Sequence, residues 1–213
     1  MGRYVVAVTG ASGAAYARRL VGVLAGAAHN VELLVTSAGF AVLAHELDWD
    51  DVRYAGEGGL AGRCARFFRP AGAPGDVRFH PIHDVLDGLA SGSEPTDGMV
   101  VVPCTMGRVS AIAGGRSSDL LERAADVTLK EGRPLVLVPR ETPLSLIHLR
   151  NLTALAEAGA VVLPAMPGFY HHPRTVDDLV DFLVAKVCAR LRLPEAAALL
   201  PPWSALRERA GPG

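Results

Sequence analysis

Cysteine is scarce in this sequence of 213 residues, the net charge is close to zero, and long apolar runs are missing. The three cysteines, Cys64, Cys104 and Cys188, are far apart and show no C-x-x-C spacing, which indicates neither a zinc site nor a disulfide framework. No apolar run reaches the ~18 residues that a membrane span requires. A net charge of −1 provides no basic stripe for nucleic acid. We therefore expect neither a membrane protein nor a nucleic-acid-binding protein.

The apolar content is nevertheless high. Hydrophobic residues make up 50% of the sequence and the mean hydropathy is +0.26, above the usual range for a soluble domain. This excess predicts burial between subunits and hence a homo-oligomer. The first residues run directly into an apolar strand pattern and leave no room for a signal peptide, so we expect a cytoplasmic location.

Short β-branched runs alternate with amphipathic stretches along the chain. The pattern predicts an α/β fold: a doubly wound parallel sheet with helices on both faces, in three layers. The expected strands are residues 3–8, 31–36, 98–103, 134–139 and 160–163, and the expected helices are residues 12–27, 38–47, 105–113, 117–130, 145–158 and 175–191.

We interpret residues 1–195 as a single domain. Within it, residues 56–75 are rich in glycine and predict a long loop insert. Residues 196–213 are expected to form a C-terminal arm in which Trp203 is the one large anchor.

The first expected strand leads into a helix through Gly10, Ala11, Ser12 and Gly13. Glycine allows close approach of the backbone, and the free amides and dipole of a helix N-terminus favour an anion, to which Ser12 adds a hydroxyl. The G-x-G-x-x-G fingerprint is absent, and residues 35–37 offer no acid for a ribose. The turn therefore fits the phosphate monoester of FMN better than NAD; a tight turn with only a packing role is the alternative.

More specific motifs occupy the second half of the chain. Residues 103–107 read PCTMG at the end of a buried strand, residues 121–131 read LERAADVTLKE, residues 134–144 read PLVLVPRETPL, and residues 167–170 read PGFY. In order and spacing these motifs resemble the flavin prenyltransferases, the UbiX family, over residues 5–37 and 91–191.

The resemblance implies a flavodoxin-like (Rossmann-type) fold and assembly into a dodecamer built of trimers. It also implies a reaction without metal, in which the dimethylallyl group of dimethylallyl phosphate is joined to N5 and C6 of reduced FMN. The product, prenylated FMN, then serves UbiD-type decarboxylases.

Site residues follow from the resemblance as well. FMN is expected against residues at the carboxyl ends of the predicted strands, as the rule for open parallel sheets also requires: Gly10, Ala11, Ser12, Ser37, Thr105, Met106, Gly107, Arg108 and Arg140. Dimethylallyl phosphate is expected at Tyr170, Lys186, Ala90 and Ser91. Catalysis is expected to involve Glu141 as a proton shuttle, with Lys130, Arg123 and Ser12, some of these side chains coming from a neighbouring subunit.

Two further positions concern the same site. Glu46 is a candidate second acid, although its spacing from Ser37 is one residue shorter than in the family. Val85 stands where some relatives carry Trp, so Trp203 is a candidate to supply the aromatic face that stabilises an allylic cation.

Structural interpretations compete with the functional ones. Arg123, Asp126 and Lys130 share one helix face at i, i+3 and i+7, a spacing typical of exposed ion pairs worth ~0.3–0.5 kcal/mol each. Cys104 fits a small buried residue better than a nucleophile.

Two motifs resemble metal sites. Residues 177–181 match the D-D-x-x-D magnesium motif of other prenyl-transferring enzymes, but Thr175 three residues before Asp178 predicts a capping box at a helix start. His171 and His172, followed by proline, predict a loop rather than a metal site.

Three other functions fit part of the sequence. An FMN-dependent decarboxylase of the same superfamily would carry a Pro-Ala-x-x-Asn-Thr signature, which this sequence lacks. A non-catalytic FMN carrier subunit of a decarboxylase would keep the same phosphate-binding turn. An NAD-dependent oxidoreductase is disfavoured by the missing acid after the second strand.

Overall fold

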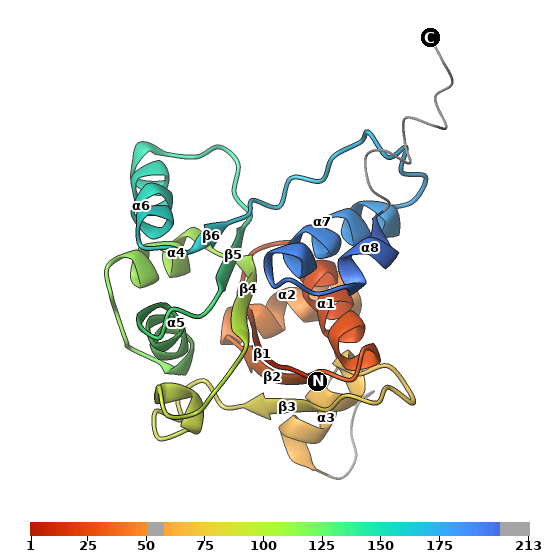
Figure 1. Ribbon diagram of the computed structural model, residues 1–213, viewed down its shortest axis with the longest axis horizontal. Helices are drawn as coiled ribbons and strands as arrows, with labels where there is room; N and C mark the ends of the chain where they lie inside the picture. Colours follow the sequence, from red (N-terminus) through yellow and green to blue (C-terminus); the bar gives the residue numbers. More distant parts are fainter. Residues whose placement is uncertain (51–57, 201–213) are drawn as a thin grey trace.

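The computed structural model describes residues 1–50 and 58–200 (Figure 1). Its centre is a six-stranded parallel sheet with the order β3-β2-β1-β4-β5-β6. The strands are β1 (Arg3–Val8), β2 (Asn30–Val35), β3 (Val77–His80), β4 (Gly98–Cys104), β5 (Leu135–Pro139) and β6 (Val161–Val162). The strand order reverses direction between β1 and β4, which is the point at which doubly wound sheets bind ligands.

Helices cover both faces of the sheet. They are α1 (Ala14–Gly26), α2 (Ser37–Leu47), α3 (Gly59–Phe68), α4 (Met106–Ala113), α5 (Leu120–Lys130), α6 (Leu146–Glu157), α7 (Val176–Arg190) and α8 (Glu195–Leu199), with a 3-10 turn, η1, at Gly88–Ala90. Figure 1 shows α4, α5 and α6 on one side of the sheet and α1, α2 and α7 on the other. The predicted three-layer α/β/α fold is confirmed.

Each face of the sheet has its own apolar core because successive strand residues point to opposite sides. Val6 and Val8 of β1 pack with α1 and α7, whereas Val5 and Ala7 pack with α4 and α5. This two-sided burial explains why the strands are apolar at nearly every position.

The predicted loop over residues 56–75 is wrong for residues 59–68, whereas residues 69–75 have no helix or strand. Residues 59–68 form α3, which buries Cys64, Phe67 and Phe68. Phe67 makes an edge contact with Trp49 at a centroid distance of 5.1 Å. Cys64, Phe67 and Phe68 have the i, i+3, i+4 spacing of a buried helix face, a signal that the surrounding glycines obscured. Strand β3, which follows α3, was also missed.

The end of the domain differs from the prediction too. Part of the expected arm is the short helix α8, whose Ala196 and Leu199 pack against the core, so the domain extends beyond residue 195. Trp203 lies outside the described residues. Within residues 1–50 and 58–200, no helix combines the length and apolar character needed to cross a membrane.

Candidate active site

A cavity of about 230 Å³ lies where the carboxyl ends of β1, β2 and β4 meet. This position is the one expected for a ligand of an open parallel sheet. It brings four of the predicted site residues together, namely Gly10, Ser37, Thr105 and Arg108. The remaining lining residues are Thr9, Thr36, Ala38, Ile82, His83 and Asp119, which the sequence reasoning missed.

Thr9 fixes the strand ends that frame the cavity. Its buried hydroxyl donates to the carbonyl of Pro103 at 2.7 Å and accepts from the amide of Thr105 at 2.9 Å. The ends of β1 and β4 are therefore held together by one side chain. A polar residue at the end of an apolar strand was the available signal for this role.

Two helices begin at the cavity. Thr36 caps α2 by accepting from the amide of Gly39 at 2.9 Å, and Thr105 caps α4 by accepting from the amide of Arg108 at 3.3 Å. Both cap residues line the cavity. Because helix N-termini present free amides and the positive end of the dipole, an anion is favoured here.

Gly10 lets the first turn approach α2. A Cβ atom at Gly10 would lie only 2.5 Å from the Cβ of Ala38. The backbone at residue 10 and the first turn of α2 thus form one wall of the cavity with no space for a side chain.

An apolar cavity of about 490 Å³ adjoins the polar one. The two share Ser37, Ile82 and His83. Phe40 and Phe79 are among the apolar walls of the larger cavity. A polar compartment at helix N-termini beside an apolar compartment suits a ligand that has both a phosphate and an aromatic ring system, as FMN does.

Arg108 lines the polar cavity with its charge already paired. Its guanidinium contacts Asp119 at 2.6 Å and Glu122 at 2.7 Å. Both carboxylates are buried, and Asp119 also caps α5. Arg108 therefore acts as a rigid wall whose side chain is held by α5.

The amides that follow the first turn bind a carboxylate of the protein itself, and the FMN phosphate expected at this turn stays a prediction. The carboxylate of Glu46 accepts from the amides of Gly13 and Ala14 at 2.9 and 2.8 Å. Burial by itself would raise the pKa of Glu46, but hydrogen bonds from Ser12 and these amides, together with the charge of Arg140, lower it. Ser12, Glu46 and Arg140 thus form one cluster beside the polar cavity.

Arg123 lies in the first turn of α5, and Lys130 is its last residue. Arg123 donates from Nε to the carbonyl of Ala90 at 3.1 Å and pairs with Asp126 at 3.0 Å. Lys130, at the far end of α5, pairs with Glu131 at 3.2 Å. Eleven helical residues span about 16 Å, and α5 begins beside the cavity at Asp119, so Lys130 lies away from the cavity, toward the amino ends of the strands.

Tyr170 and Lys186 meet at Phe182. The Tyr170 ring lies 5.5 Å from the Phe182 ring, and the Lys186 ammonium lies 5.3 Å from the same ring. Both side chains are exposed and lie outside the two cavities of the described chain. One chain therefore brings this pair together but leaves it away from its own cavity.

Glu141, Ser91 and Val85 are exposed. Glu141 follows β5 directly, and its carboxylate accepts from the amide of Thr142. Val85 and Ser91 lie between β3 and β4, on either side of η1. Ala11 and Met106 are buried beside the lining residues Gly10 and Thr105, and Gly107 is exposed in the first turn of α4.

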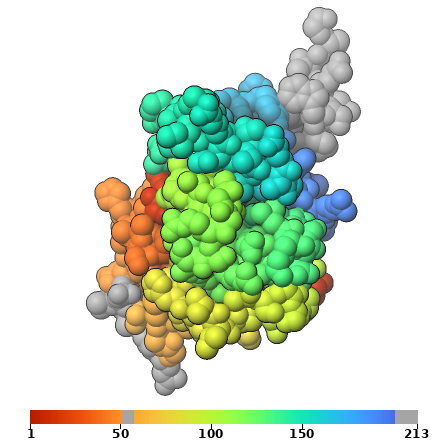
Figure 2. Space-filling view, turned by 90° about the vertical axis from the view of Figure 1, so that its left-hand side faces the viewer, coloured from red at the N-terminus to blue at the C-terminus, as the bar shows by residue number. Residues whose placement is uncertain are grey.

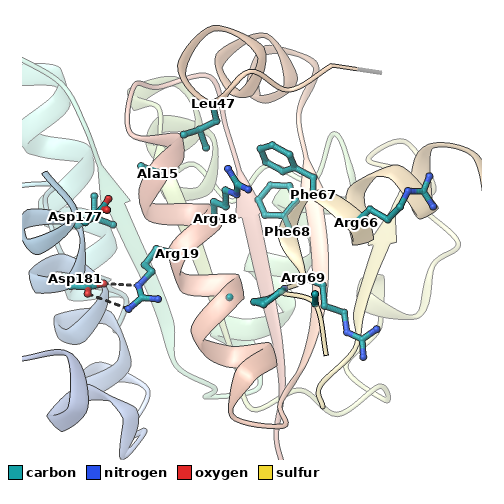
Figure 3. A pocket seen from close by; sticks show the side chains of 14 residues that line it. Ala15, Arg18, Arg19, Leu47, Arg66, Phe67, Phe68, Arg69, Asp177 and Asp181 are labelled. Carbon is teal, nitrogen blue, oxygen red and sulfur yellow. Dashed lines mark hydrogen bonds and ion pairs between the residues drawn. The ribbon is translucent and has the colours of Figure 1, made fainter. Parts of the chain in front are cut away.

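A cavity of about 740 Å³ lies elsewhere, between α1, α7 and residues 66–71. Arg19 forms an ion pair with Asp181 on one side of this cavity (Figure 3), with 2.6 Å between Arg19 Nε and Asp181 Oδ1. Arg69 donates to the backbone of Gly75, and Arg18 lies over the Phe67 ring. None of the predicted site residues lines this cavity in the described chain, so the candidate site is the cavity at the strand ends.

The metal-like motifs have structural roles. Thr175 and Asp178 form the predicted capping box of α7. His171 stacks on Phe182 at 5.2 Å. In the described part of the chain, no three His, Cys, Asp or Glu side chains converge as a metal site. Cys104 is fully buried, which raises the pKa of its thiol to about 12.

The model of the family described as Flavoprotein matches residues 2–188, which agrees with the cavity and fold. The chain is 46% identical over 192 residues to the flavin prenyltransferase UbiX of Halalkalibacterium halodurans, covering 89% of this chain and 88% of that protein. The chain belongs to the flavin prenyltransferases, the UbiX family.

Solved structures agree. The fold is similar to that of AnUbiX in complex with FMN and dimethylallyl pyrophosphate, with a TM-score of 0.81 and 35% identity over 95% of this chain and 97% of that one. It is also similar to a dodecameric FMN-dependent UbiX-like decarboxylase from Escherichia coli O157:H7, with a TM-score of 0.76 and 37% identity over 90% and 95% of the two chains. The predicted family and fold are confirmed.

Proposed function

We propose that this chain is a flavin prenyltransferase that joins the dimethylallyl group of dimethylallyl phosphate to N5 and C6 of reduced FMN. Family membership supports the reaction class. The observation that carries the proposal is the polar cavity at the N-termini of α2 and α4, which opens beside an apolar cavity.

FMN is assigned to these two cavities. Ser37 and Thr105, with the free amides of α2 and α4, would hold its phosphate. The aromatic walls at Phe40 and Phe79 suit the isoalloxazine ring. When bound and reduced, FMN supplies the nucleophilic N5 and C6 positions.

The phosphate of the allylic donor is assigned to cations. Tyr170 and Lys186, with Arg123 and Lys130, are the candidates to neutralise phosphate as it leaves, some of them presented by a neighbouring copy; such electrostatic stabilisation dominates many reactions of this kind. Closure of the new ring at C6 requires removal of a proton, for which Glu141 and the released phosphate are the candidates.

The site is assigned to an assembly rather than to one chain. Tyr170 and Lys186 lie away from their own chain's cavity, so a neighbouring copy would present them. Large apolar side chains are exposed on α6, on the segment between β6 and α7, and at the start of α7: Leu146, Ile147, Leu149, Met166, Phe169 and Val176. Burial of these side chains between copies would stabilise an oligomer, and a similar structure is dodecameric.

Kinetics of donor use test this assignment. Reduced FMN and dimethylallyl phosphate are mixed anaerobically with the protein, and the flavin absorbance is followed. Lys186→Ala should raise KM for dimethylallyl phosphate roughly tenfold or more, because a charged phosphate contact is lost, without changing the Kd for FMN. Arg190→Ala, an exposed cation on the same helix, is the control.

Two alternatives predict other outcomes. An FMN-dependent decarboxylase or a carrier subunit would bind FMN tightly yet show no flavin change that depends on dimethylallyl phosphate. Equal loss of FMN binding and donor use in Lys186→Ala would contradict the role of Lys186. The supply of prenylated FMN to a UbiD-type decarboxylase and the cytoplasmic location stay predictions.

A further inference from the structure

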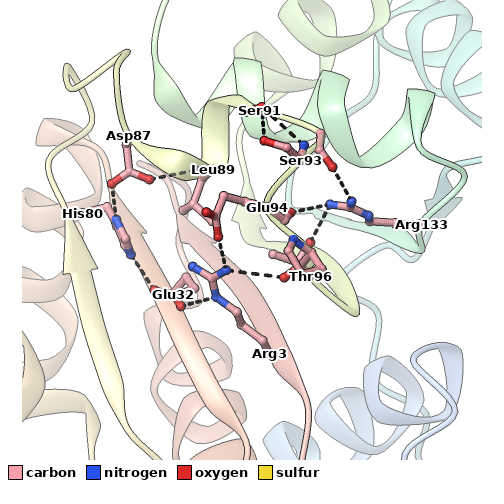
Figure 4. A network of polar contacts seen from close by, with 12 residues as sticks. Arg3, Glu32, His80, Asp87, Leu89, Ser91, Ser93, Glu94, Thr96 and Arg133 are labelled. Atoms are coloured by element: carbon pink, nitrogen blue, oxygen red, sulfur yellow. Dashed lines mark hydrogen bonds and ion pairs between the residues drawn. The ribbon is translucent and has the colours of Figure 1, made fainter.

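A row of charged side chains, with buried Glu32 and His80 at its centre, crosses one face of the sheet (Figure 4). Glu32 of β2 is only 4% exposed, and its two oxygens contact Arg3 Nε and His80 Nε2, each at 2.5 Å. The other ring nitrogen of His80 contacts Asp87 at 2.5 Å. His80, at the end of β3, is therefore held between two carboxylates.

This row holds one segment of the chain, residues 81–96, which we call the covering segment. It connects β3 to β4 and includes η1. In Figure 2 it forms a yellow band along the bottom of the molecule, below the green surface of α4 and α5. Ile82 and His83 of this segment line both cavities, and Ala90 and Ser91 are the residues expected at the allylic donor.

The covering segment is attached to the sheet at two points. Asp87 is tied through His80 to Glu32, and its other oxygen accepts from the amide of Leu89 at 2.8 Å, which starts η1. Glu94 is tied at 3.0 Å to Arg3, which also contacts Glu32. Both attachments converge on Glu32, and Ala90 and Ser91 lie between them.

Other anchors hold the backbone of the segment. Arg133 donates to the carbonyls of Gly92 and Glu94, both at 2.9 Å, and Arg123 donates to the carbonyl of Ala90. The His80–Asp87 contact differs because it connects the segment directly to the end of β3, beside the cavity residues Ile82 and His83.

Fold stability alone does not require such a row. The same sheet face is apolar on β4 and β5, where Met99, Val101, Leu135 and Leu137 are buried. Buried ion pairs contribute less to stability than well-packed apolar side chains of similar size, because each charge is removed from water. Their directional contacts are better suited to fixing the orientation of a loop.

We propose that His80 is a positioning residue, whose imidazolium, held between Glu32 and Asp87, fixes the covering segment so that Ala90 and Ser91 are placed for the allylic donor. The proposal rests on the proposed prenyltransferase function. It adds His80 as a residue that sets the affinity for the donor without contacting it.

The charge state of His80 supports this role. The charged groups around it are Glu32 of β2, Asp87 and Glu94 of the covering segment, and Arg3 of β1. Burial by itself would lower the pKa of His80, but hydrogen bonds to Glu32 and Asp87 raise it above the ordinary value of 6.5. We call the contacts of His80 with Glu32 and Asp87 the clamp. His80 is charged, and the clamp is intact, below that raised pKa. The clamp weakens as the pH rises through this pKa and His80 loses its charge.

His80→Gln tests the proposal, since glutamine keeps hydrogen-bonding capacity but removes the cation. We expect KM for dimethylallyl phosphate to rise roughly tenfold to a hundredfold, because a small misplacement of a binding residue has effects of this size. The rate constant kcat should change much less. The rise of wild-type KM at alkaline pH should disappear in the variant. Arg78→Gln, an exposed residue of the same strand, is the control.

Amide hydrogen exchange measures the clamp independently of prenyl transfer. In His80→Gln, exchange should accelerate across residues 84–94 and stay unchanged in β1, β4 and α5. Asp87→Asn, which retains an oxygen for the amide of Leu89, should give the same pattern and serves if His80→Gln does not fold.

Unchanged donor KM and unchanged exchange in the segment would overturn the proposal. So would a general loss of protection with equal loss of kcat and FMN affinity, since that result indicates a purely structural role. If even the wild-type protein transfers no prenyl group, the prenyltransferase assignment fails, and the exchange pattern still decides whether His80 holds the segment.

Discussion

Replacing Glu32 by Gln should destabilise the protein strongly at neutral pH. The carboxylate is buried and contacts both Arg3 and His80. Glutamine has nearly the same shape but no charge, so the change leaves two cations facing a neutral group. Removal of one partner from a buried ion pair is among the larger effects of single substitutions.

The size of the effect follows from the pKa of Glu32. Burial raises this pKa, but hydrogen bonds from His80 and Arg3 lower it by more, from 4.5 to about 2. Because one pKa unit corresponds to about 1.4 kcal/mol, the ionised carboxylate stabilises the fold by about 3 kcal/mol at neutral pH. This contribution is complete above pH 4.5 and is lost as the pH falls toward about 2.

Thermal unfolding at two pH values is the assay. At pH 7 the melting temperature of Glu32→Gln should be about 6–12 °C below that of the wild type, as expected for 3 kcal/mol in a domain of this size. At pH 3, between the two pKa values, less than half of the difference should remain. Glu94→Gln is the matched control, since Glu94 also pairs with Arg3 but is half exposed, and exposed pairs contribute ~1 kcal/mol or less.

Two results would refute this reasoning. One is a loss of stability in Glu32→Gln no larger than in Glu94→Gln. The other is a loss that is the same at pH 3 and pH 7, because a difference independent of pH cannot come from the ionisation of Glu32.

Three further predictions concern the first turn, the metal-like motif and the buried thiol. Gly10→Ala should weaken FMN binding roughly tenfold or more in a fluorescence titration, because its Cβ would lie 2.5 Å from that of Ala38, whereas Gly26→Ala, with open space, should bind normally; equal affinities would contradict the close packing. Asp178→Ala should lower the melting temperature through loss of the capping box, while EDTA leaves wild-type activity unchanged; inhibition by EDTA would show that metal is required. Cys104, with its pKa raised to about 12, should resist iodoacetamide at pH 8 in folded protein and react after unfolding, as measured by mass spectrometry; rapid labelling of folded protein would show an accessible thiolate.

The sequence predicts the sheet well because its strands are buried on both faces. Runs such as RYVVAV and GMVVVP need no partner to be recognised, and glycine or proline marks their ends. Strand β3 is different: VRFH has only four residues at the sheet edge, with one of them exposed and one partly exposed. Its place depends on pairing with β2, which local sequence does not encode.

Part of the site follows from the same rule. Gly10, Ser37, Thr105 and Arg108 follow strand ends, so the order of strands alone brings them to one cavity. The partners of Arg108 lie at the start of α5, and no local sequence pattern predicts that Asp119 and Glu122 are buried.

Long-range ion pairs are the part that sequence cannot supply. Glu32 and His80 are 48 positions apart, and each in isolation fits an ordinary polar residue of a strand. Only the parallel register, in which Leu34 pairs with His80, places both side chains on the same face. The convergence of Tyr170 and Lys186 on Phe182 depends in the same way on the packing of α7.

The mass of the flavin after reaction tests the central claim most directly. The wild-type protein is incubated anaerobically with reduced FMN and dimethylallyl phosphate, the flavin is extracted, and its mass is recorded beside a sample without donor. A gain of one five-carbon unit on the flavin, with release of inorganic phosphate, is the predicted result. Recovery of unmodified FMN from protein that binds it tightly would contradict the account.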